Sequence, residues 1–533
     1  MVYLLYMLQV VGILTASTEH VGTEAMNSSS TDSYGLVQGT IFVDSTGANT
    51  TLWTQWHESI AYSPSVDGIQ IVNRGYAFTG ILNVHQIPGD LSFVVHDNAA
   101  YDASLGFARY PTSITSDEAH ISLPTLGDSW GYMVAVQCSA GWYSGSWDSP
   151  VDVGPNDVDV HKCIGKQLPD GNILFIGVTV TDMIIYRVWN ASLTNQIASG
   201  TLAIDVTYWG FDINGGIGYV FYYDTFNDTL IYYRTTSDGM TWSAEQIWSL
   251  AFTPPYLNTE ILLFRQVALT DDGQPRLVFN AIDGDDPTYP WYGKIYLSHT
   301  SGVPPFELTA ALGDTETVYP TVACGGGKSS VIFNVPRNNL EDSLTWWDIH
   351  YCYSTDNGFT WSTPINLTQS SPSRIGLQQI AKRVDTLRNE FFYIYCTDMI
   401  ENHDPLFHIM FDPEALDPMY IFMGYASTVG VGEDTTRPSV DMRYELAVYP
   451  NPCKDIVTIQ CSAPHGSISS ELQIYDTAGR LIRSSRLTHN AQHTTFVSWD
   501  GTDNQGNHLP AGVYFVRLQT AGYKETKKVI LLN

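Results

Sequence analysis

The chain has 533 residues and a net charge of −30 at pH 7. Only 15% of its residues are charged and 13% are aromatic, so the composition favours β structure and excludes a disordered chain. The negative charge repels nucleic acid and anionic membranes, and we expect neither as a partner. A length beyond that of one ordinary domain predicts more than one folded unit.

An apolar run begins the chain, from Val2 to Ala16, and polar residues follow from Ser17 onward. About 15 residues are too few for a comfortable transmembrane helix but suit the hydrophobic region of a secretory signal peptide. We therefore expect residues 1–17 to be a signal peptide, although the usual basic residues before the run are missing. A buried N-terminal strand is the alternative. No later run is long and apolar enough to cross a membrane, so we expect no transmembrane span in the mature chain.

The cysteines and acidic loops predict no metal site and no cofactor. The seven cysteines are scattered and show no C-x-x-C spacing, so they are expected to be small core residues. The loop from Asp283 to Asp286 lacks the full ligand spacing of a calcium site, and we interpret it as a solvated turn. The turn that holds Asp500, Asp503 and Asn504 has the same interpretation.

One unit recurs from about residue 35 to residue 438: an apolar strand, a polar turn of Gly, Asp or Asn, then a second apolar strand. The turns are centred near residues 89, 117, 170, 215, 272, 326 and 387. Most lie 45 to 61 residues apart, which suits a propeller blade of four short strands. The first two are only 28 residues apart, so we assign them to one blade and predict six blades. Two unrelated β-sandwiches would explain the alternation but not this period.

A turn motif, S-x-D-x-G-x-T-W, runs from Ser354 to Trp361 directly after an alternating strand pattern. Ser354 and Asp356 can accept hydrogen bonds from nearby backbone amides, and Gly358 can adopt a positive φ. Trp361 can bury its ring against the hairpin. The motif resembles the Asp-box of the bacterial neuraminidase repeat family, which occurs in sialidase-like β-propellers. The resemblance implies a turn on the outer rim that stabilises the fold and takes no part in catalysis.

An imperfect copy of this motif precedes it, from Thr235 to Trp242. Gly239 and Trp242 keep their places, whereas Ser237 stands where the motif has Asp. The copies begin 119 residues apart, which is about two blades. We therefore expect a second structural box at these four positions, with Trp242 and Trp361 both buried.

The composition changes near Arg437-Pro438, after a segment from Gly430 to Thr436 that has the composition of a linker. Residues 442–533 then contain short alternating strands, which predict a separate β-sandwich. They include four distinctive pieces in order: Tyr449-Pro450-Asn451-Pro452, Trp499-Asp500-Gly501, Pro510-Ala511-Gly512-Val513-Tyr514 and Lys527-Lys528-Val529.

These pieces resemble the C-terminal sorting domain of the type IX secretion system, a small immunoglobulin-like β-sandwich. The resemblance implies export by the type IX machinery, through the periplasm, to the outside of the cell or the outer-membrane surface. The residues that carry it are Pro450, Asn451, Pro452, Gly512, Tyr514 and Lys527. An accessory sandwich without a sorting role is the alternative.

A sialidase of the resembled family needs three arginines, a Tyr nucleophile activated by Glu, and an Asp as acid and base. Its Arg-Ile-Pro motif has its nearest counterpart in Arg109-Tyr110-Pro111, but Tyr319-Pro320 stands in a similar place without an arginine. We therefore carry over no catalytic residue. The arginines of the repeat region are Arg74, Arg109, Arg187, Arg234, Arg265, Arg276, Arg337, Arg374, Arg383 and Arg388.

The sequence thus predicts an all-β protein: a six-bladed Asp-box β-propeller over residues 35–438, then an immunoglobulin-like sandwich over 442–533. The favoured function is non-catalytic binding of a glycan or protein ligand by a secreted or cell-surface bacterial protein. The loop with Trp142 and Trp147, and the pair Trp346-Trp347, could stack on sugar rings if exposed. A divergent exo-glycosidase of the sialidase type is the alternative, and a structural spacer is a third possibility.

Overall fold

The computed structural model describes most of the chain from residue 41 to residue 532. The signal peptide expected at residues 1–17 and the segment from Gly430 to Thr436 lie outside the described residues. The described residues are 41–46, 58–74, 81–91, 95–100, 107–108, 112–114, 120–126, 133–144, 146–155, 160–224, 230–251, 255, 259–262, 267–283, 293–315, 317–336, 347–368, 374–398, 419–428, 445–449, 451, 453, 457–462, 470–487, 494–519 and 524–532.

In the described part of the chain, thirty strands, β1 to β30, form seven antiparallel sheets, which we number in chain order. Sheet 1 contains β2 (Ile60–Ser63), β3 (Gly68–Arg74), β4 (Ile81–Pro88) and β5 (Val95–Ala100). Sheet 2 contains β6 (Phe107–Ala108), β7 (Thr112–Ile114), β8 (His120–Leu126), β9 (Met133–Gln137) and β10 (Val151–Asp152). Sheet 3 contains β11 (Val160–Gln167), β12 (Ile173–Thr179), β13 (Ile184–Trp189) and β14 (Gln196–Ala203).

Sheet 4 contains β15 (Val206–Asn214), β16 (Ile217–Asp224), β17 (Ile231–Thr236) and β18 (Gln246–Trp248). Sheet 5 contains β19 (Thr259–Leu262), β20 (Val267–Leu269), β21 (Pro275–Asp283), β22 (Gly293–Ser298) and β23 (Phe306–Glu307). Sheet 6 contains β24 (Val318–Gly325), β25 (Lys328–Pro336), β26 (Trp347–Ser354) and β27 (Ile365–Asn366). Sheet 7 contains β28 (Arg374–Ile380), β29 (Glu390–Asp398), β30 (Met419–Ser427) and β1 (Ile41–Thr46). A short 3₁₀ helix, η2 (Ala310–Leu312), follows β23.

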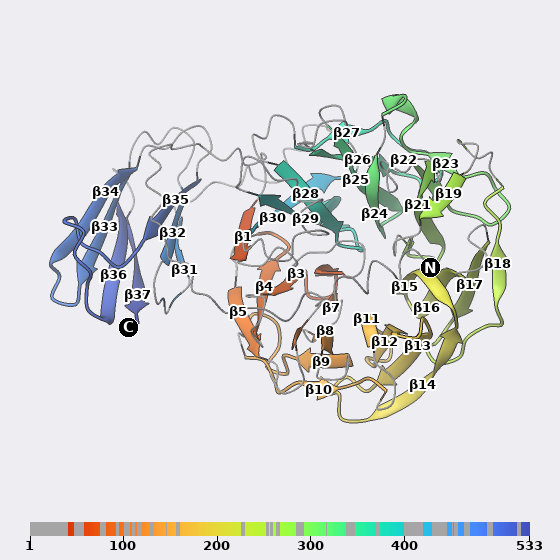
Figure 1. Cartoon of the computed structure of the whole chain (residues 1–533), viewed down its shortest axis with the longest axis horizontal. Coiled ribbons are helices and arrows are strands. Elements are labelled where there is room, and N and C mark those ends of the chain that lie inside the picture. Colours follow the sequence, from red (N-terminus) through yellow and green to blue (C-terminus); the bar gives the residue numbers. More distant parts are fainter. Residues whose placement is uncertain are drawn as a thin grey trace, which may run out of the picture. The chain divides into compact units, whose positions relative to one another are not determined.

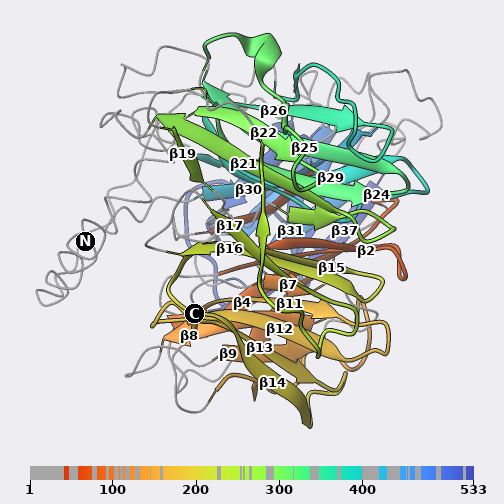
Figure 2. The ribbon, with the colours of Figure 1, turned by 90° about the vertical axis from the view of Figure 1, so that its right-hand side faces the viewer.

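The seven sheets form a closed ring (Figure 1). Strands β2, β7, β11, β15, β20, β24 and β28 each contact the next in this order, and β28 contacts β2 again. These are therefore the inner strands, and the ring has no first or last sheet. Sheet 7 is itself closed by β1, the most N-terminal described strand, which pairs with β30. Figure 2 shows the sheets from the side. This is the arrangement of a β-propeller.

The prediction of six blades is wrong, because the described residues form seven sheets. The turn after Pro88 joins the third and fourth strands of sheet 1, whereas the connection near residue 117 joins β7 and β8 of sheet 2. The turn of sheet 1 that corresponds to the others is at residues 64–67, between β2 and β3. Turn composition does not reveal which pair of strands a turn joins, so two turns of different kinds were assigned to one unit.

Apolar side chains fill the spaces between neighbouring sheets. Between sheets 3 and 4, for example, Ile176 and Val188 pack with Phe211 and Val220. Strand β12 is thus covered on both faces, and all seven of its residues are buried, whereas the outer strand β14 is largely exposed. The tight turns between such strands use glycine where φ is positive, as at Gly171 (φ +87°).

The Tyr-Pro pair at Tyr319 marks a β-bulge at the start of the inner strand β24. The register of β24 with β25 shifts between Val318 and Thr321, and Tyr319 has a positive φ of 56°. Its carbonyl oxygen accepts a hydrogen bond of 2.7 Å from the side chain of Gln378 on β28. The bulge is therefore held by the neighbouring sheet. The counterpart at Tyr110 lies outside the described residues.

The remaining strands form two further antiparallel sheets. One contains β31 (Glu445–Tyr449), β32 (Val457–Ser462) and β35 (Thr494–Trp499); the other contains β34 (Leu481–Leu487), β33 (Ser470–Asp476), β36 (Gly512–Gln519) and β37 (Lys524–Leu531). Ile459 and Trp499 from the first sheet share one apolar core with Ile474, Val516 and Val529 from the second. Two sheets with a common core make a β-sandwich.

The five cysteines whose side chains are described are all buried, as expected of small core residues: Cys138, Cys163, Cys324, Cys352 and Cys453. Within the described part of the chain, no helix is long and apolar enough to cross a membrane.

Candidate functional site

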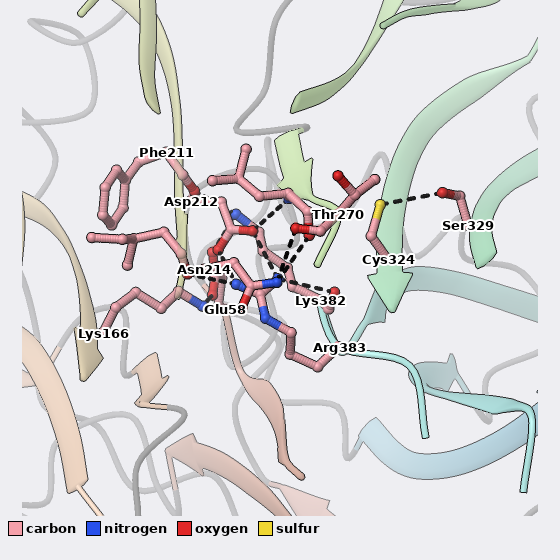
Figure 3. Close-up of polar contacts among 12 residues, drawn as sticks. Glu58, Lys166, Phe211, Asp212, Asn214, Thr270, Cys324, Ser329, Lys382 and Arg383 are labelled. Atoms are coloured by element: carbon pink, nitrogen blue, oxygen red, sulfur yellow. Dashed lines mark hydrogen bonds and ion pairs between the residues drawn. The ribbon is translucent and has the colours of Figure 1, made fainter. Parts of the chain in front are cut away.

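Five charged side chains from four different sheets meet at the centre of the ring (Figure 3). Glu58 lies just before β2, Lys166 on β11 and Asp212 on β15, while Lys382 and Arg383 follow β28. All five side chains are at most 11% exposed. We call this set the central ion cluster.

Glu58 links two lysines from different sheets. The amide of Ser59 donates a 2.7 Å hydrogen bond to the side chain of Gln379, which holds this segment against β28. The carboxylate of Glu58 then lies 2.5 Å from Lys166 Nζ through Oε2 and 2.7 Å from Lys382 Nζ through Oε1. One carboxylate therefore joins sheets 1, 3 and 7.

The two ammonium groups keep Glu58 ionised. Burial by itself would raise its pKa, but the charges and hydrogen bonds of Lys166 and Lys382 hold the pKa at about 2. Burial lowers the pKa of Lys382, although Glu58 and Asp212 act in the opposite direction. The carboxylate is therefore paired and ionised near neutral pH and is not a general acid.

The depressed pKa of Glu58 predicts a loss of stability in acid. The folded protein holds this carboxylate ionised while the unfolded chain protonates it near pH 4.5. Its contribution is thus present above pH 4.5 and is lost as the pH falls towards about 2. The shift corresponds to a contribution on the order of 3 kcal/mol. Urea unfolding between pH 6 and pH 3 checks this, because a Glu58→Gln variant should show a flatter dependence on pH.

Asp212 and Arg383 form the second pair of the cluster. Arg383 reaches both carboxylate oxygens of Asp212, at 2.8 and 3.0 Å, and also donates to the carbonyl oxygen of Ile213 at 2.6 Å. The amide of Leu269 on β20 donates to the same carboxylate at 2.8 Å. Burial would lower the pKa of Arg383, but Asp212 outweighs it and raises the pKa. This bidentate pair joins sheets 4, 5 and 7.

The backbone of sheet 6 positions the cationic pair. The amide of Cys324 on β24 donates to the carbonyl oxygen of Lys382 at 3.0 Å, and the amide of Val384 donates back to Cys324 at 3.2 Å. Burial raises the pKa of the Cys324 thiol to about 11, so it is not a nucleophile at neutral pH. Lys382 also donates to the carbonyl oxygen of Phe211 at 2.6 Å. The cluster therefore links the inner strands of different sheets and stabilises the ring.

Sequence reasoning named only Arg383 of these five residues, and without a role. Each lies on or beside an ordinary apolar strand, with no local motif. The available signal was a charged residue within an otherwise buried strand, as at Lys166 between Gly165 and Gln167 in β11.

The predicted box at Ser354 folds as a compact hydrogen-bonded turn after β26. The Ser354 hydroxyl accepts a hydrogen bond of 2.8 Å from the amide of Gly358 and donates one of 2.7 Å to the carboxylate of Asp356. Asp356 accepts the amides of Phe359 and Thr360 at 3.2 and 2.9 Å. The Thr360 hydroxyl also donates to Asp356 at 2.7 Å. The small desolvation of this exposed side chain would raise its pKa, but the hydrogen bonds from Thr360, Ser354 and Phe359 hold the pKa at about 2. Gly358 has a φ of +84°, which suits glycine.

The upstream copy folds in the same way with a different register. Thr236, not Thr235, accepts the amide of Gly239, at 2.9 Å. Asp238, not Ser237, accepts the amides of the two residues after Gly239, at 2.8 and 2.7 Å. This turn is one residue shorter than the box at Ser354, which explains why alignment on the glycine placed Ser237 at the acidic position. Ser237 is exposed and Thr235 lies on β17.

The two box tryptophans are half-buried rather than buried. Trp361 donates from its indole nitrogen to the carbonyl oxygen of Gly358 at 3.0 Å. Trp242 packs beside the rings of Tyr186 and Phe211, with centroids 6.0 and 6.5 Å away. Each ring covers the edge of a sheet interface, so one side of it stays in solvent.

Both turns are attached to the preceding sheet. Arg276 on β21 donates to the carbonyl oxygen of Asn357, and its guanidinium lies over the ring of Phe359. In the upstream copy, the Tyr186 hydroxyl on β13 donates to the carbonyl oxygen of Met240 at 3.0 Å. The turns therefore link sheets 5 and 6, and sheets 3 and 4.

Asp356→Ala is expected to cost about 1–3 kcal/mol of unfolding free energy, because it leaves several turn amides without an acceptor. Asp356→Asn keeps one oxygen acceptor and should cost less. Urea unfolding measures both, and any binding activity should survive in the folded variants. Loss of binding at an unchanged melting temperature would place the ligand site at this turn and contradict a structural role.

The five arginines of the repeat region whose side chains are described do not converge. Arg383 pairs with Asp212, whereas Arg388 binds Asp67 and Asp385. The other three donate to backbone carbonyl oxygens: Arg187 to Tyr186, Arg234 to Ser243, and Arg276 to Pro275 and Asn357. The side chains of the remaining five lie outside the described part of the chain: Arg74, Arg109, Arg265, Arg337 and Arg374.

The other features singled out in the sequence lie partly within the described residues. Trp347 is fully buried, and Trp142 and Trp147 are half-buried. Asp503 accepts backbone amides within its own turn, including that of Asn507 at 2.9 Å. Trp346 and most of the Asp283 to Asp286 loop lie outside the described residues. Among the described residues, no group of three His, Cys, Asp or Glu is placed to hold a metal ion.

In the sandwich, two of the predicted sorting residues have clear packing roles. Asn451 donates to the carbonyl oxygen of Lys528 at 2.6 Å and accepts the amide of Ile530 at 2.9 Å, so it ties its segment to β37. The Tyr514 hydroxyl donates to the carbonyl oxygen of Pro510 at 2.7 Å. Gly512 begins β36, and Lys527 is exposed on β37. Pro450 and Pro452 lie outside the described residues.

Residues 447–532 match the family model of the secretion system C-terminal sorting domain. The chain therefore carries a C-terminal sorting domain of the type IX secretion system. This confirms the predicted location, which is secreted or at the cell surface beyond the outer membrane.

Comparison with curated proteins gives no match. Among solved structures, the chain is similar to an ulvan lyase of polysaccharide lyase family PL25, with 10% identity over 68% of this chain and 93% of that one and a TM-score of 0.49. It is similar to PorZ, a surface component of the type IX secretion system of Porphyromonas gingivalis, with 13% identity over 89% and 59% and a TM-score of 0.39. A sialidase of Trypanosoma rangeli has 9% identity over 92% and 89% and a TM-score of 0.38.

Proposed function

We propose that this is a secreted or surface-bound bacterial binding protein, in which a seven-bladed β-propeller recognises a glycan or protein ligand without catalysis. Residues from about 35 to 438 make the propeller, and residues 442–533 make an immunoglobulin-like sandwich that directs export. The two boxes, at Ser354 and at Thr236, are Asp-boxes that stabilise the rim.

The observation that carries the non-catalytic proposal is the central ion cluster. Both carboxylates of the central ion cluster are already paired, Glu58 with two lysines and Asp212 with Arg383. A glycosidase needs one carboxylic acid with a raised pKa beside a carboxylate or other nucleophile. The pKa of Glu58 is instead held low. Glu58 is thus not a proton donor at neutral pH, and both oxygens of Asp212 are occupied by Arg383.

The alternative, a divergent exo-glycosidase of the sialidase type, requires three arginines around one substrate carboxylate. In the repeat region, the five arginines with described side chains each bind separate partners. An enzyme of this type would have to draw its arginines from the other five.

The test is a glycan array run in parallel with hydrolysis of a fluorogenic sialoside by the same purified protein. Binding to a defined set of glycans without hydrolysis supports the proposal. Turnover of the sialoside that is lost in Arg109→Lys would overturn it in favour of the glycosidase. The matched control is Arg187→Lys, since Arg187 donates to a backbone carbonyl oxygen on an outer strand.

A further inference from the structure

The central ion cluster contains one more positive charge than negative charge. Among the described residues, Lys166, Lys382 and Arg383 are paired with two carboxylates, Glu58 and Asp212. Counted by formal charge, the set therefore carries an excess of one positive charge. All five side chains are at most 11% exposed, and a buried charge without a counter-charge is strongly unfavourable.

The excess charge is on the two lysines. Arg383 and Asp212 form a neutral bidentate pair, whereas the two ammonium groups share the single carboxylate of Glu58. Lys382 uses a second N–H on the carbonyl oxygen of Phe211. Lys166 has Glu58 as its one partner among the described residues. An ammonium group has three N–H donors, so Lys166 has donors left for a ligand.

We propose that the central ion cluster binds one small anion beside Lys166 Nζ, a halide or the carboxylate of a small organic acid. Such a ligand balances the excess charge and accepts the remaining Lys166 donors. The buried position favours a small monovalent ion over a large one. The chain as a whole is strongly negative, so affinity comes from these local charges and not from the overall field. This inference is independent of the proposed glycan or protein ligand.

The direct test is a crystal of the full chain grown in sodium bromide, with anomalous diffraction measured at the bromine absorption edge. We expect an anomalous peak within hydrogen-bond distance of Lys166 Nζ. Peaks confined to the protein surface, with none at the ring centre, would overturn the proposal.

Melting temperatures give a second measurement. Bromide is compared with acetate and with a bulky sulfonate at equal ionic strength, because a ligand that binds only the folded state raises the melting temperature. We expect bromide to raise it above the sulfonate control. An added rise with acetate identifies a site that also takes a carboxylate; no added rise with acetate identifies a halide site. Equal melting temperatures in bromide and sulfonate would contradict the proposal.

Two variants change the charge balance in opposite directions. Lys166→Gln removes the excess charge and should lose the bromide response, while Glu58→Gln increases the excess and should strengthen it. Lys294→Gln is the matched control, since Lys294 lies on β22 and donates to the backbone of the loop after η2. A bromide response kept in Lys166→Gln would contradict the assignment, and this holds even if Glu58→Gln does not fold.

Discussion

Glu58→Gln is expected to lower the free energy of unfolding of the ring of sheets by about 3–5 kcal/mol, the usual cost of removing one partner from a buried ion pair. The substitution keeps the size of the side chain and removes its charge. It leaves Lys166 and Lys382 buried without their carboxylate. Since Glu58 joins sheets 1, 3 and 7, the loss should appear in the cooperative unfolding of the whole ring, measured by urea denaturation with tryptophan fluorescence.

Glu245→Gln is the matched control for this substitution. Glu245 is exposed and accepts the Tyr222 hydroxyl at 2.6 Å, and an amide oxygen can accept the same bond. We expect a change within about 0.5 kcal/mol, as for most surface substitutions. If Glu58→Gln and Glu245→Gln lower the free energy of unfolding equally, the central ion cluster does not stabilise the ring.

A chain that ends near Thr436 is expected to fold its ring but to remain in the periplasm of a host with the type IX machinery. The sorting-domain match lies wholly beyond this point, at residues 447–532. The sandwich buries its own core around Trp499, so the ring should not need it to fold. Cell fractionation and immunoblotting measure the location, and circular dichroism of the purified chain measures its folding.

The reciprocal experiment joins residues 440–533 to a periplasmic reporter. We expect the reporter outside the cell in a host with the type IX machinery and inside a matched strain that lacks it. If the truncated chain still reaches the surface, the sandwich is an accessory domain with no sorting role. The two results together separate a folding defect from a sorting defect.

Features built from neighbouring residues were predictable. The turn at Ser354 makes its hydrogen bonds within a few residues, so the spacing of Ser354, Asp356 and Gly358 predicted the geometry that is found. The sorting domain was likewise predictable from Asn451 and the Tyr514 segment. The upstream box shows the limit, because its turn is one residue shorter and the acidic role belongs to Asp238, not Ser237.

The sequence by itself determined the strands, the turns and the export signal, because these depend on alternation and on contacts between residues close along the chain. The number of sheets was decided by the fold, since only pairing shows which strands a turn joins. So was the central ion cluster: Lys166 and Glu58 are 108 residues apart, and Arg383 and Asp212 are 171 apart. These charges meet because ring closure brings inner strands together, and no local pattern of residues records that closure.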